Sequence, residues 1–418
     1  CRRQFYNFVL TRWATTMRLR HVLLVAQLSL WSVAVFGHGK VDGPVAYNDR
    51  MIEFPDTDNH LTLVVDLHTH SVFSDGHVWP VIRVEEALRD GLDGIAITEH
   101  LEWQPHLKDI PHPDRNRAYE EAKKAANNRD IIVISGGEIT RRMPAGHMNA
   151  VFLTNANSLL DMTKALSQER DTDKFYRKSR KWPAQNAVEA ANDQGAFVFW
   201  NHPSWSSQKP DGIAEITGFH ERNAKANLLH GIEIANGPEY SEEAFAIALK
   251  HNLALIGTSD VHDLIDWDYK PHLGGHRPVT LVLSKEKTAR SMKEALFARR
   301  TVVWFKNQLF GRQSELAPLL KASMVAGSAR WLKKTTILEI QIENKSDAKY
   351  LLQNQSNVSF VGAGDILEVL PKSTSVFRVK PGKKQDQLKL EFKVLNALTA
   401  PGKPAEIAFR FVPTDATI

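Results

Sequence analysis

Short apolar runs alternate with helix-like segments from residue 61 to residue 284. Strands and helices that alternate at this spacing predict a parallel sheet covered by helices, and seven such runs predict a closed or nearly closed β/α barrel. The runs that predict strands are Leu63–Asp66, Gly94–Thr98, Ile131–Ser135, Ala196–Trp200, Gly231–Ile234, Leu253–Gly257 and Val279–Leu283. The segments that predict helices are Val81–Arg89, Arg115–Asn127, Ala184–Asp193, Glu242–Lys250 and Thr288–Arg299.

The pattern changes after residue 320, where alternating β-rich segments are separated by Gly, Pro, Asn and Lys. This pattern predicts an all-β sandwich of about one hundred residues. We therefore expect upstream residues and a signal peptide in 1–37, the α/β barrel in 38–320 and the β-sandwich in 321–418. The predicted sandwich strands are Thr336–Ile342, Val358–Val361, Ile366–Leu370, Val376–Val379, Leu388–Val394 and Glu406–Val412.

The N-terminal residues have the pattern of an export signal. Met17 is the expected start, because it opens a short cationic segment that is followed by the apolar stretch Val22–Phe36. A membrane-spanning helix needs about 20 apolar residues, so this stretch is short for an anchor and fits the hydrophobic part of a signal peptide. We expect a periplasmic or extracellular protein with no integral membrane span after signal removal. The alternative is an uncleaved anchor.

The charge distribution argues against nucleic acid as a stable partner. The chain has 53 Lys and Arg against 48 Asp and Glu, and the whole excess of +5 lies in five arginines of residues 1–37. The predicted barrel carries a net −6 and the predicted sandwich +6. Composition is that of an ordinary globular protein, which excludes disordered and polytopic membrane classes. Cys1 is the only cysteine, so thiolate-bound zinc and cysteine nucleophiles are excluded from the rest of the chain.

Histidines and carboxylates stand where the predicted strands end. Active sites of such barrels are built at the carboxyl ends of the strands, and residues i and i+2 of a strand face the same side. Imidazoles and carboxylates without thiolates suit Zn, Mn or Fe. One such pair is a weak signal, but repetition at successive strand ends predicts a metal centre. The candidate ligands are His68, His70, Asp75, His100, Glu138, His147, His202, Asp260 and His262, with His77 as the alternative to Asp75.

These motifs resemble those of the PHP family, the polymerase and histidinol phosphatase metal-dependent phosphoesterases, over roughly 61–300. The stretch Asp66-Leu-His-Thr-His-Ser-Val-Phe-Ser-Asp75-Gly matches the opening motif of the family, and Thr98-Glu99-His100 stands where the family usually has Thr-Asp-His. The resemblance implies a distorted (β/α)7 PHP barrel and three divalent metal ions. Mn is expected first, with Zn or Fe as alternatives. The implied ligand sets are His68, His70, Glu138 and Asp260; Glu138, His147 and His202; and Asp75, His100 and His262.

Within that family the chain is most similar to exported bacterial phosphodiesterases of the Sb-PDE type. The similarity lies in Thr98-Glu99-His100, Trp200-Asn-His202-Pro203, His276-Arg277-Pro278 and the additional C-terminal β domain. It implies hydrolysis of a small-molecule phosphodiester. The alternatives are a phosphomonoesterase, an amidohydrolase-type hydrolase and a binding module without catalysis.

The resemblance also sets expectations for the mechanism. Clustered divalent ions supply hydroxide near neutral pH and stabilise both the attacking and the leaving oxygen at phosphorus. Glu138 is expected to bridge two ions, and His202 or His262 to assist proton transfer. An anionic phosphate also calls for a bidentate donor, for which the candidates are Arg141, Arg142 and Arg277.

Overall fold

The computed structural model describes residues 50–161 and 163–415, and these belong to one compact unit. The expected start at Met17 and the signal segment lie outside the described residues. In the described part of the chain, every helix is too short or too polar to cross a membrane.

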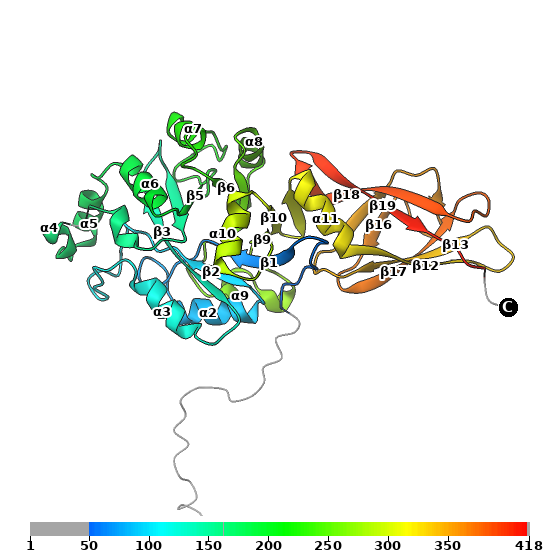
Figure 1. The fold of residues 1–418 in the computed structure, drawn as a ribbon, viewed down its shortest axis with the longest axis horizontal. Coiled ribbons are helices and arrows are strands. Elements are labelled where there is room, and N and C mark those ends of the chain that lie inside the picture. Colours follow the sequence, from blue (N-terminus) through cyan, green and yellow to red (C-terminus); the bar gives the residue numbers. More distant parts are fainter. Residues whose placement is uncertain (1–49, 162, 416–418) are drawn as a thin grey trace, which may run out of the picture. The chain divides into compact units, whose positions relative to one another are not determined.

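The first part of the chain forms a barrel whose strands run β9-β1-β2-β3-β4-β5-β6-β8 (Figure 1). Neighbours are parallel within β1-β2-β3 and within β5-β6-β8, whereas β4 is antiparallel to both of its neighbours and β9 is antiparallel to β1. The strands are β1 (Leu61–Asp66), β2 (Gly94–Ile97), β3 (Ile132–Thr140), β4 (His147–Val151), β5 (Phe197–Trp200), β6 (Gly231–Asn236), β7 (Glu239–Tyr240), β8 (Ala254–Thr258) and β9 (Val279–Ser284).

Several of the helices between the strands, among them α6, α8 and α10, bury their apolar faces against this sheet, whereas α4 and α5 pack in a separate small cluster. Several begin with a side chain that accepts a hydrogen bond from a backbone N–H of the first turn, such as Ser241, Thr217 and Thr288. The helices are α2 (Pro80–Arg89), α3 (Arg117–Ala125), α4 (Lys164–Ser167), α5 (Thr172–Ser179), α6 (Ala184–Asp193), α7 (Gly218–Lys225), α8 (Glu242–Lys250), α9 (Ile265–Asp268), α10 (Ala289–Phe297) and α11 (Gln313–Ser323), with 3₁₀ turns η1 (Ala156–Leu159) and η2 (Pro271–Leu273).

The seven predicted barrel strands are all present, and the distorted barrel is confirmed. Two features differ from a regular parallel barrel. The strand β4 was not predicted, because its residues His147 and Asn149 are polar and interrupt the apolar run. The last predicted strand, β9, runs antiparallel to β1 rather than parallel.

The barrel closes where the chain leaves β1 and β8. The N–H of His70 donates to the carbonyl of Val261 at 3.1 Å, and the N–H of Asp260 donates to the carbonyl of His68 at 2.9 Å. Within β8, Gly257 lies against β9 and β10 (Thr301–Phe305). The hydroxyl of Thr280 on β9 donates to the Gly257 carbonyl. The two histidines after β1 and the two residues after β8 therefore lie at one rim.

The C-terminal part is a β-sandwich, as predicted. One of its sheets has the order β16-β14-β18-β19 and the other the order β12-β13-β17-β15, with a core of buried apolar side chains. Two strands were missed: β12, which contains glycine and a bulge, and β14, which is short. The strands are β12 (Met324–Trp331), β13 (Leu338–Asn344), β14 (Tyr350–Asn354), β15 (Ser359–Phe360), β16 (Ile366–Val369), β17 (Ser373–Lys380), β18 (Leu388–Ala400) and β19 (Lys403–Phe411).

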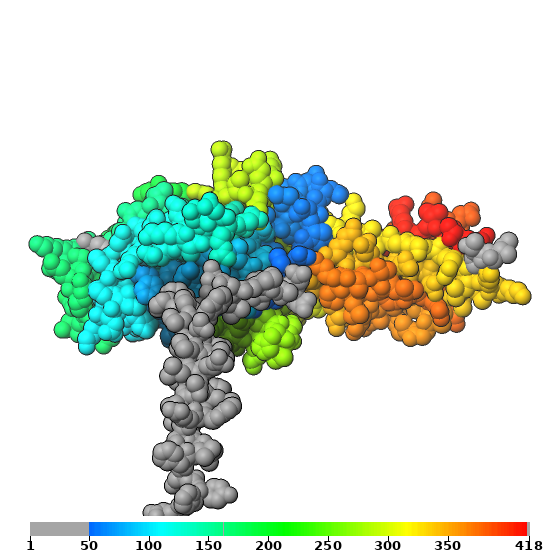
Figure 2. Space-filling model, turned by 90° about the horizontal axis from the view of Figure 1, so that it is seen from below, coloured from blue at the N-terminus to red at the C-terminus, as the bar shows by residue number. Residues whose placement is uncertain are grey.

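The sandwich is joined to the barrel by a continuous sheet. β10 forms a hairpin with β11 (Gln308–Gly311), and β11 pairs in parallel with β18. The first described residues also contact the sandwich, since the N–H of Glu53 donates to Asp347 at 2.5 Å; Figure 2 shows this blue segment beside the orange strands. The expected domain boundary at residue 320 falls inside α11 and stays a prediction.

The contact of Gly257 with β10 gives a test of barrel closure. A Cβ on Gly257 would lie 2.4 Å from Val303 Cγ1 and 3.2 Å from the Val279 carbonyl oxygen. We expect Gly257→Ala to lower the free energy of unfolding by about 1–3 kcal/mol, because overpacking forces neighbouring groups to shift. Urea unfolding measures this change. Gly364→Ala is the control, since its Cβ would enter open space.

A second variant separates crowding from a general loss of stability. If the crowding explanation is right, Val303→Ala combined with Gly257→Ala costs less than the sum of the two single substitutions, because the shortened side chain makes room for the new Cβ. Additive costs would contradict the proposed contact.

Candidate metal centre

Three of the candidate ligands converge where β1 and β8 end. The Nε2 atoms of His68 and His70 lie 3.2 and 3.1 Å from Asp260 Oδ1, and they lie 3.0 Å from each other. Both histidines are almost completely buried. Both histidines follow directly after β1, and both imidazoles point to the same buried site, as the sequence predicts.

The hydrogen-bond partners of these two histidines fix their tautomers. His68 Nδ1 lies 2.8 Å from the carboxylate of Glu233 and therefore carries the proton. His70 Nδ1 lies 3.1 Å from the hydroxyl of Ser74, which itself donates to Glu99 and must accept from the imidazole. When both rings are neutral, two unprotonated Nε2 atoms face each other and a carboxylate oxygen. That arrangement is repulsive unless a proton or a metal ion lies between them.

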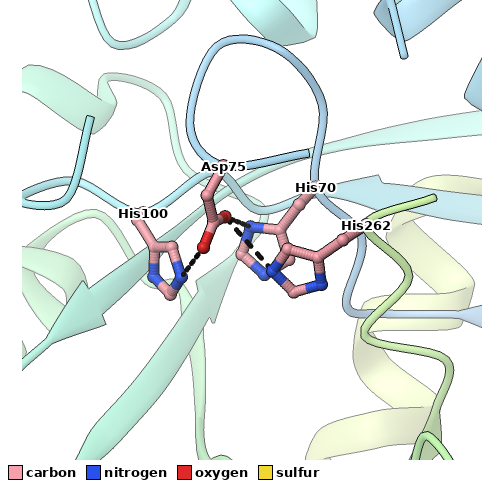
Figure 3. Close-up of side chains that lie close together, drawn as sticks. All are labelled: His70, Asp75, His100 and His262. Atoms are coloured by element: carbon pink, nitrogen blue, oxygen red, sulfur yellow. Dashed lines mark ion pairs between the residues drawn. The ribbon is translucent and has the colours of Figure 1, made fainter. Parts of the chain in front are cut away.

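A second group surrounds the carboxylate of Asp75 (Figure 3). Its oxygens lie 3.3 Å from His100 Nε2 and 3.2 Å from His262 Nε2. The Nδ1 of His262 is 2.8 Å from the Asp260 carbonyl and donates to it, so in the neutral ring Nε2 presents a lone pair to Asp75 Oδ1. That carboxylate oxygen is buried and has no hydrogen-bond donor. Here too, two electron-pair donors face each other.

The third group surrounds Glu138, a fully buried residue of β3. One carboxylate oxygen lies 2.9 Å from His147 Nδ1 and 3.5 Å from His202 Nε2, and accepts a hydrogen bond from the Asn201 amide at 3.0 Å. The other oxygen contacts His100 Nδ1 and has no satisfied hydrogen bond. It also lies 3.6–3.7 Å from the two histidines of β1, so Glu138 stands between the groups.

The donor spacing fits bound metal ions. A tetrahedral metal with bonds of about 2.0–2.2 Å separates its ligands by roughly 3.3–3.6 Å, close to the 3.0–3.3 Å separations in the first two groups. All nine predicted ligand residues lie at this rim, whereas His77 is turned outward and pairs with Asp263. Three sets of potential ligands lie within 4.8 Å of one another: His68, His70 and Asp260; His70, Asp75, His100 and His262; and His100, Glu138 and His147.

These groupings differ in detail from the ligand sets that the resemblance implies. His70 belongs to two groups, and His100 lies next to Glu138 as well as Asp75. The three groups are therefore contiguous, and one side chain can serve neighbouring ions. The division of the nine residues among individual ions stays a prediction.

The electrostatics of the rim favour cations. Burial lowers the pKa of His68, but the carboxylates of Asp260 and Glu233 outweigh burial and raise it well above its usual value. Burial also lowers the pKa of His262, yet Asp75 and Asp260 raise it to about 9. Burial lowers the pKa of His70 to about 3, helped by the neighbouring histidines. Without a metal, the carboxylates therefore hold protons on some imidazoles, and a bound cation displaces them.

A cavity of about 570 Å³ opens over this rim. Its walls include six of the nine candidate ligands, together with Trp205, Tyr269 and Glu239; the six are Asp75, His100, His147, His202, Asp260 and His262. Among the described residues that line it there is no lysine or arginine. An anion in this cavity would therefore depend on bound metal ions for positive charge.

The structure corrects the expectation that Arg277 and Arg141 contact the substrate. Arg277 is fully buried, and its guanidinium donates to Asp90 at 2.6 Å and to Asp66 at 3.2 Å. Arg141 is also buried, and its guanidinium pairs with the carboxylate of Glu102. Both guanidinium groups are used in internal ion pairs, and neither side chain lines the cavity. Arg142, the third candidate, is exposed and does not line it either.

Sequence reasoning missed Glu233, which organises the site from β6. Its carboxylate accepts from His68 Nδ1, from the N–H of His202 at 2.7 Å and from the Thr258 hydroxyl at 2.7 Å. The available signal was the acidic residue inside the apolar run Gly231–Ile234. Trp205 and Tyr269 of the cavity wall were also missed, because they lie in loops that no periodicity describes.

Comparison with known proteins agrees with this geometry. Residues 66–197 match the sequence profile of the PHP domain, and residues 325–410 match that of an Ig-like domain. A crystal structure from Bacteroides vulgatus, of a two-domain protein containing a predicted PHP-like metal-dependent phosphoesterase, is 35% identical to this chain. The match covers 86% of this chain and 97% of that one, with a TM-score of 0.75. The chain belongs to the PHP family.

A second relative matches only a short stretch of this PHP protein. An uncharacterized protein of Methanocaldococcus jannaschii is 40% identical over 79 residues, which are 19% of this chain. The match spans only 34% of the length of that relative.

Glu138 gives the first test of the centre. Glu138→Gln removes the negative charge at the point where two groups meet, so we expect metal affinity to fall more than about 10–100-fold. Metal content after dialysis, measured by plasma mass spectrometry, reports the loss. Glu221→Gln, on the exposed face of α7, is the control. Unchanged metal content in Glu138→Gln would exclude Glu138 as a ligand.

Arg277 gives a second test, which asks whether this residue stabilises the fold rather than binds substrate. Arg277→Met leaves the buried carboxylate of Asp66 without its cation, and removing one partner of a buried pair costs about 3–5 kcal/mol. We expect this loss in denaturant unfolding of the metal-free protein. Arg277→Lys keeps the charge but not the bidentate geometry, so its free energy of unfolding should lie between those of the wild type and Arg277→Met. Wild-type stability of Arg277→Met would contradict the structural role.

Proposed function

We propose that this PHP protein is a metal-dependent phosphoesterase that hydrolyses small-molecule phosphodiesters. The observation that carries the proposal is the convergence of nine imidazole and carboxylate side chains at one rim, six of which line a single cavity. Such a centre suits a reaction in which negative charge develops on oxygen. The similarity to the two-domain protein of Bacteroides vulgatus, which contains a predicted PHP-like metal-dependent phosphoesterase, supports the reaction class.

The residues of the rim have distinct roles in this proposal. Divalent ions bound there would lower the pKa of bound water and withdraw charge from the phosphoryl oxygens. Glu138 would hold two ions together, and Glu233 keeps His68 in the tautomer that presents Nε2 to an ion. We propose three ions, with Mn first and Zn or Fe as alternatives.

Proton transfer to the departing alcohol needs an imidazole that faces the cavity. His202 and His262 both line it, and their side chains are 12% and 33% exposed. His262 is the more exposed, but its Nδ1 donates to the Asp260 carbonyl and its Nε2 faces Asp75. The bond from His202 to Glu233 involves the backbone N–H and not the imidazole. We keep both residues as candidates for this role, which falls to whichever ring is not fully engaged as a ligand of an ion.

The charge of the cavity favours diesters over monoesters. A phosphomonoester carries about −1.5 to −2 charges at pH 7, whereas a diester carries one. The described lining offers no lysine or arginine, and it includes the carboxylates of Glu239 and Asp268. Each additional charge on the substrate would have to be neutralised by metal ions alone, so the singly charged diester is the better fit.

A substrate panel tests this proposal. We expect kcat/KM for bis(4-nitrophenyl) phosphate to exceed that for 4-nitrophenyl phosphate by at least about tenfold, because the second charge is not compensated. Chelation should abolish both activities, and Mn, Zn or Fe(II) should restore them to different degrees. A preference for the monoester would favour the phosphomonoesterase alternative. Absence of both activities in protein with full metal content would favour a binding module.

A further inference from the structure

The cavity over the metal centre adjoins a second cavity of about 290 Å³. The two share Gly237, Pro238, Asp268 and Tyr269 in their walls. Ligand pockets typically measure about 300–1,000 Å³, so the second cavity is large enough for one compact organic group. A diester bound through its phosphate at the rim would have one of its two alcohol groups directed toward it.

The far wall of this second cavity is the tip of the β10–β11 hairpin. Lys306 and Asn307 form its two-residue loop, and both have positive φ, 44° and 60°. A two-residue loop with this backbone matches the twist of the strands that it joins. Lys306 Nζ donates to the carbonyl of Pro238 at 2.9 Å, which fixes its ammonium beside the boundary between the two cavities.

The sandwich holds this hairpin tip in place. Asn307 Oδ1 accepts from the N–H of Lys349 at 2.8 Å, and its Nδ2 donates to the Lys349 carbonyl at 3.2 Å. Asn396 Nδ2 donates to the carbonyls of both Asn307 and Lys349, at 2.8 and 2.7 Å. On the barrel side, the N–H of Asn307 contacts His276 Nε2 at 3.4 Å, and the His276 ring stacks on Trp304 with centroids 3.5 Å apart.

The chemistry of the second cavity indicates what it binds. Its walls combine one ammonium, of Lys306, and one carboxylate, of Asp268, with the apolar surfaces of Phe305 and Pro278. The two charges cancel, which gives no preference for a charged group. Hydroxyl groups both accept from an ammonium and donate to a carboxylate, and a carbon ring covers the apolar walls.

We propose that this second cavity is a specificity subsite for a neutral, hydroxyl-bearing group, such as a sugar or polyol, on one side of the phosphodiester. Lys306 and Asp268 would bind its hydroxyls, and the sandwich would determine specificity by positioning the hairpin. The inference rests on the proposed phosphodiesterase function and deepens it.

Two 4-nitrophenyl phosphodiesters test the subsite: one of methanol, and one of glucose attached through its primary hydroxyl. We expect the wild-type protein to prefer the glucose diester, and Lys306→Ala to lower the ratio of the two kcat/KM values about tenfold, the usual effect of losing one charged hydrogen bond. Lys285→Ala is the control, because this exposed lysine lies outside both cavities. An unchanged ratio in Lys306→Ala would overturn the proposal.

Asn307→Gly tests the contribution of the sandwich. Glycine keeps the positive φ of the loop but removes both side-chain hydrogen bonds to Lys349. We expect KM for the glucose diester to rise several-fold with kcat retained. An equal loss of kcat for both diesters would instead indicate general damage and contradict the positioning role. If the wild-type protein with metal bound cleaves neither diester, the proposed function fails, and not merely the subsite.

Discussion

The buried carboxylate of Asp66 ties together the two strand ends on which the centre depends. It accepts from the N–H of Ser259 at 3.1 Å and from the hydroxyl of the same residue at 2.5 Å, and it pairs with Arg277. These bonds join the end of β1 to the end of β8, next to the backbone bonds that close the barrel. His68 and Asp260, which lie almost two hundred residues apart in the chain, become neighbours through this connection.

The rim brings together groups that would repel one another without a cation. Glu233 and Ser74 occupy the Nδ1 atoms of His68 and His70, so the Nε2 atoms face each other and need either a proton held by the carboxylates or a metal ion between them. A divalent ion that binds this arrangement therefore stabilises the folded protein, because the unfolded chain does not form the site. The internal ion pair of Arg277 belongs to the scaffold beneath this arrangement.

The sandwich is structurally continuous with the wall of the active cavity. β18 pairs with β11, and Asn396 bonds to the turn that joins β10 and β11. A β domain attached in this way can set the shape of the cavity mouth without contributing a ligand to the centre. The absence of histidine from residues 321–418 agrees with such a role.

The sequence by itself determined the alternation of strands and helices, the change to a β-sandwich and the side chains that carry the chemistry. This was possible because apolar periodicity and strand-end position are local properties, and because His68-Thr-His70 and Asp260-Val-His262 each stand directly after the end of a strand. All nine residues that the fold brings together could be identified from these local patterns. Their division among individual ions could not.

Only the tertiary structure decided what each polar group contacts. Arg277 follows a turn and resembles a substrate-binding residue in the sequence, but folding places it between Asp66 and Asp90. Glu233 was overlooked inside an apolar run, because its role depends on partners from β1, β5 and β8. The hairpin tip at Lys306 reaches the cavity through pairing between distant strands. Such contacts depend on long-range packing, which no local pattern in the chain encodes.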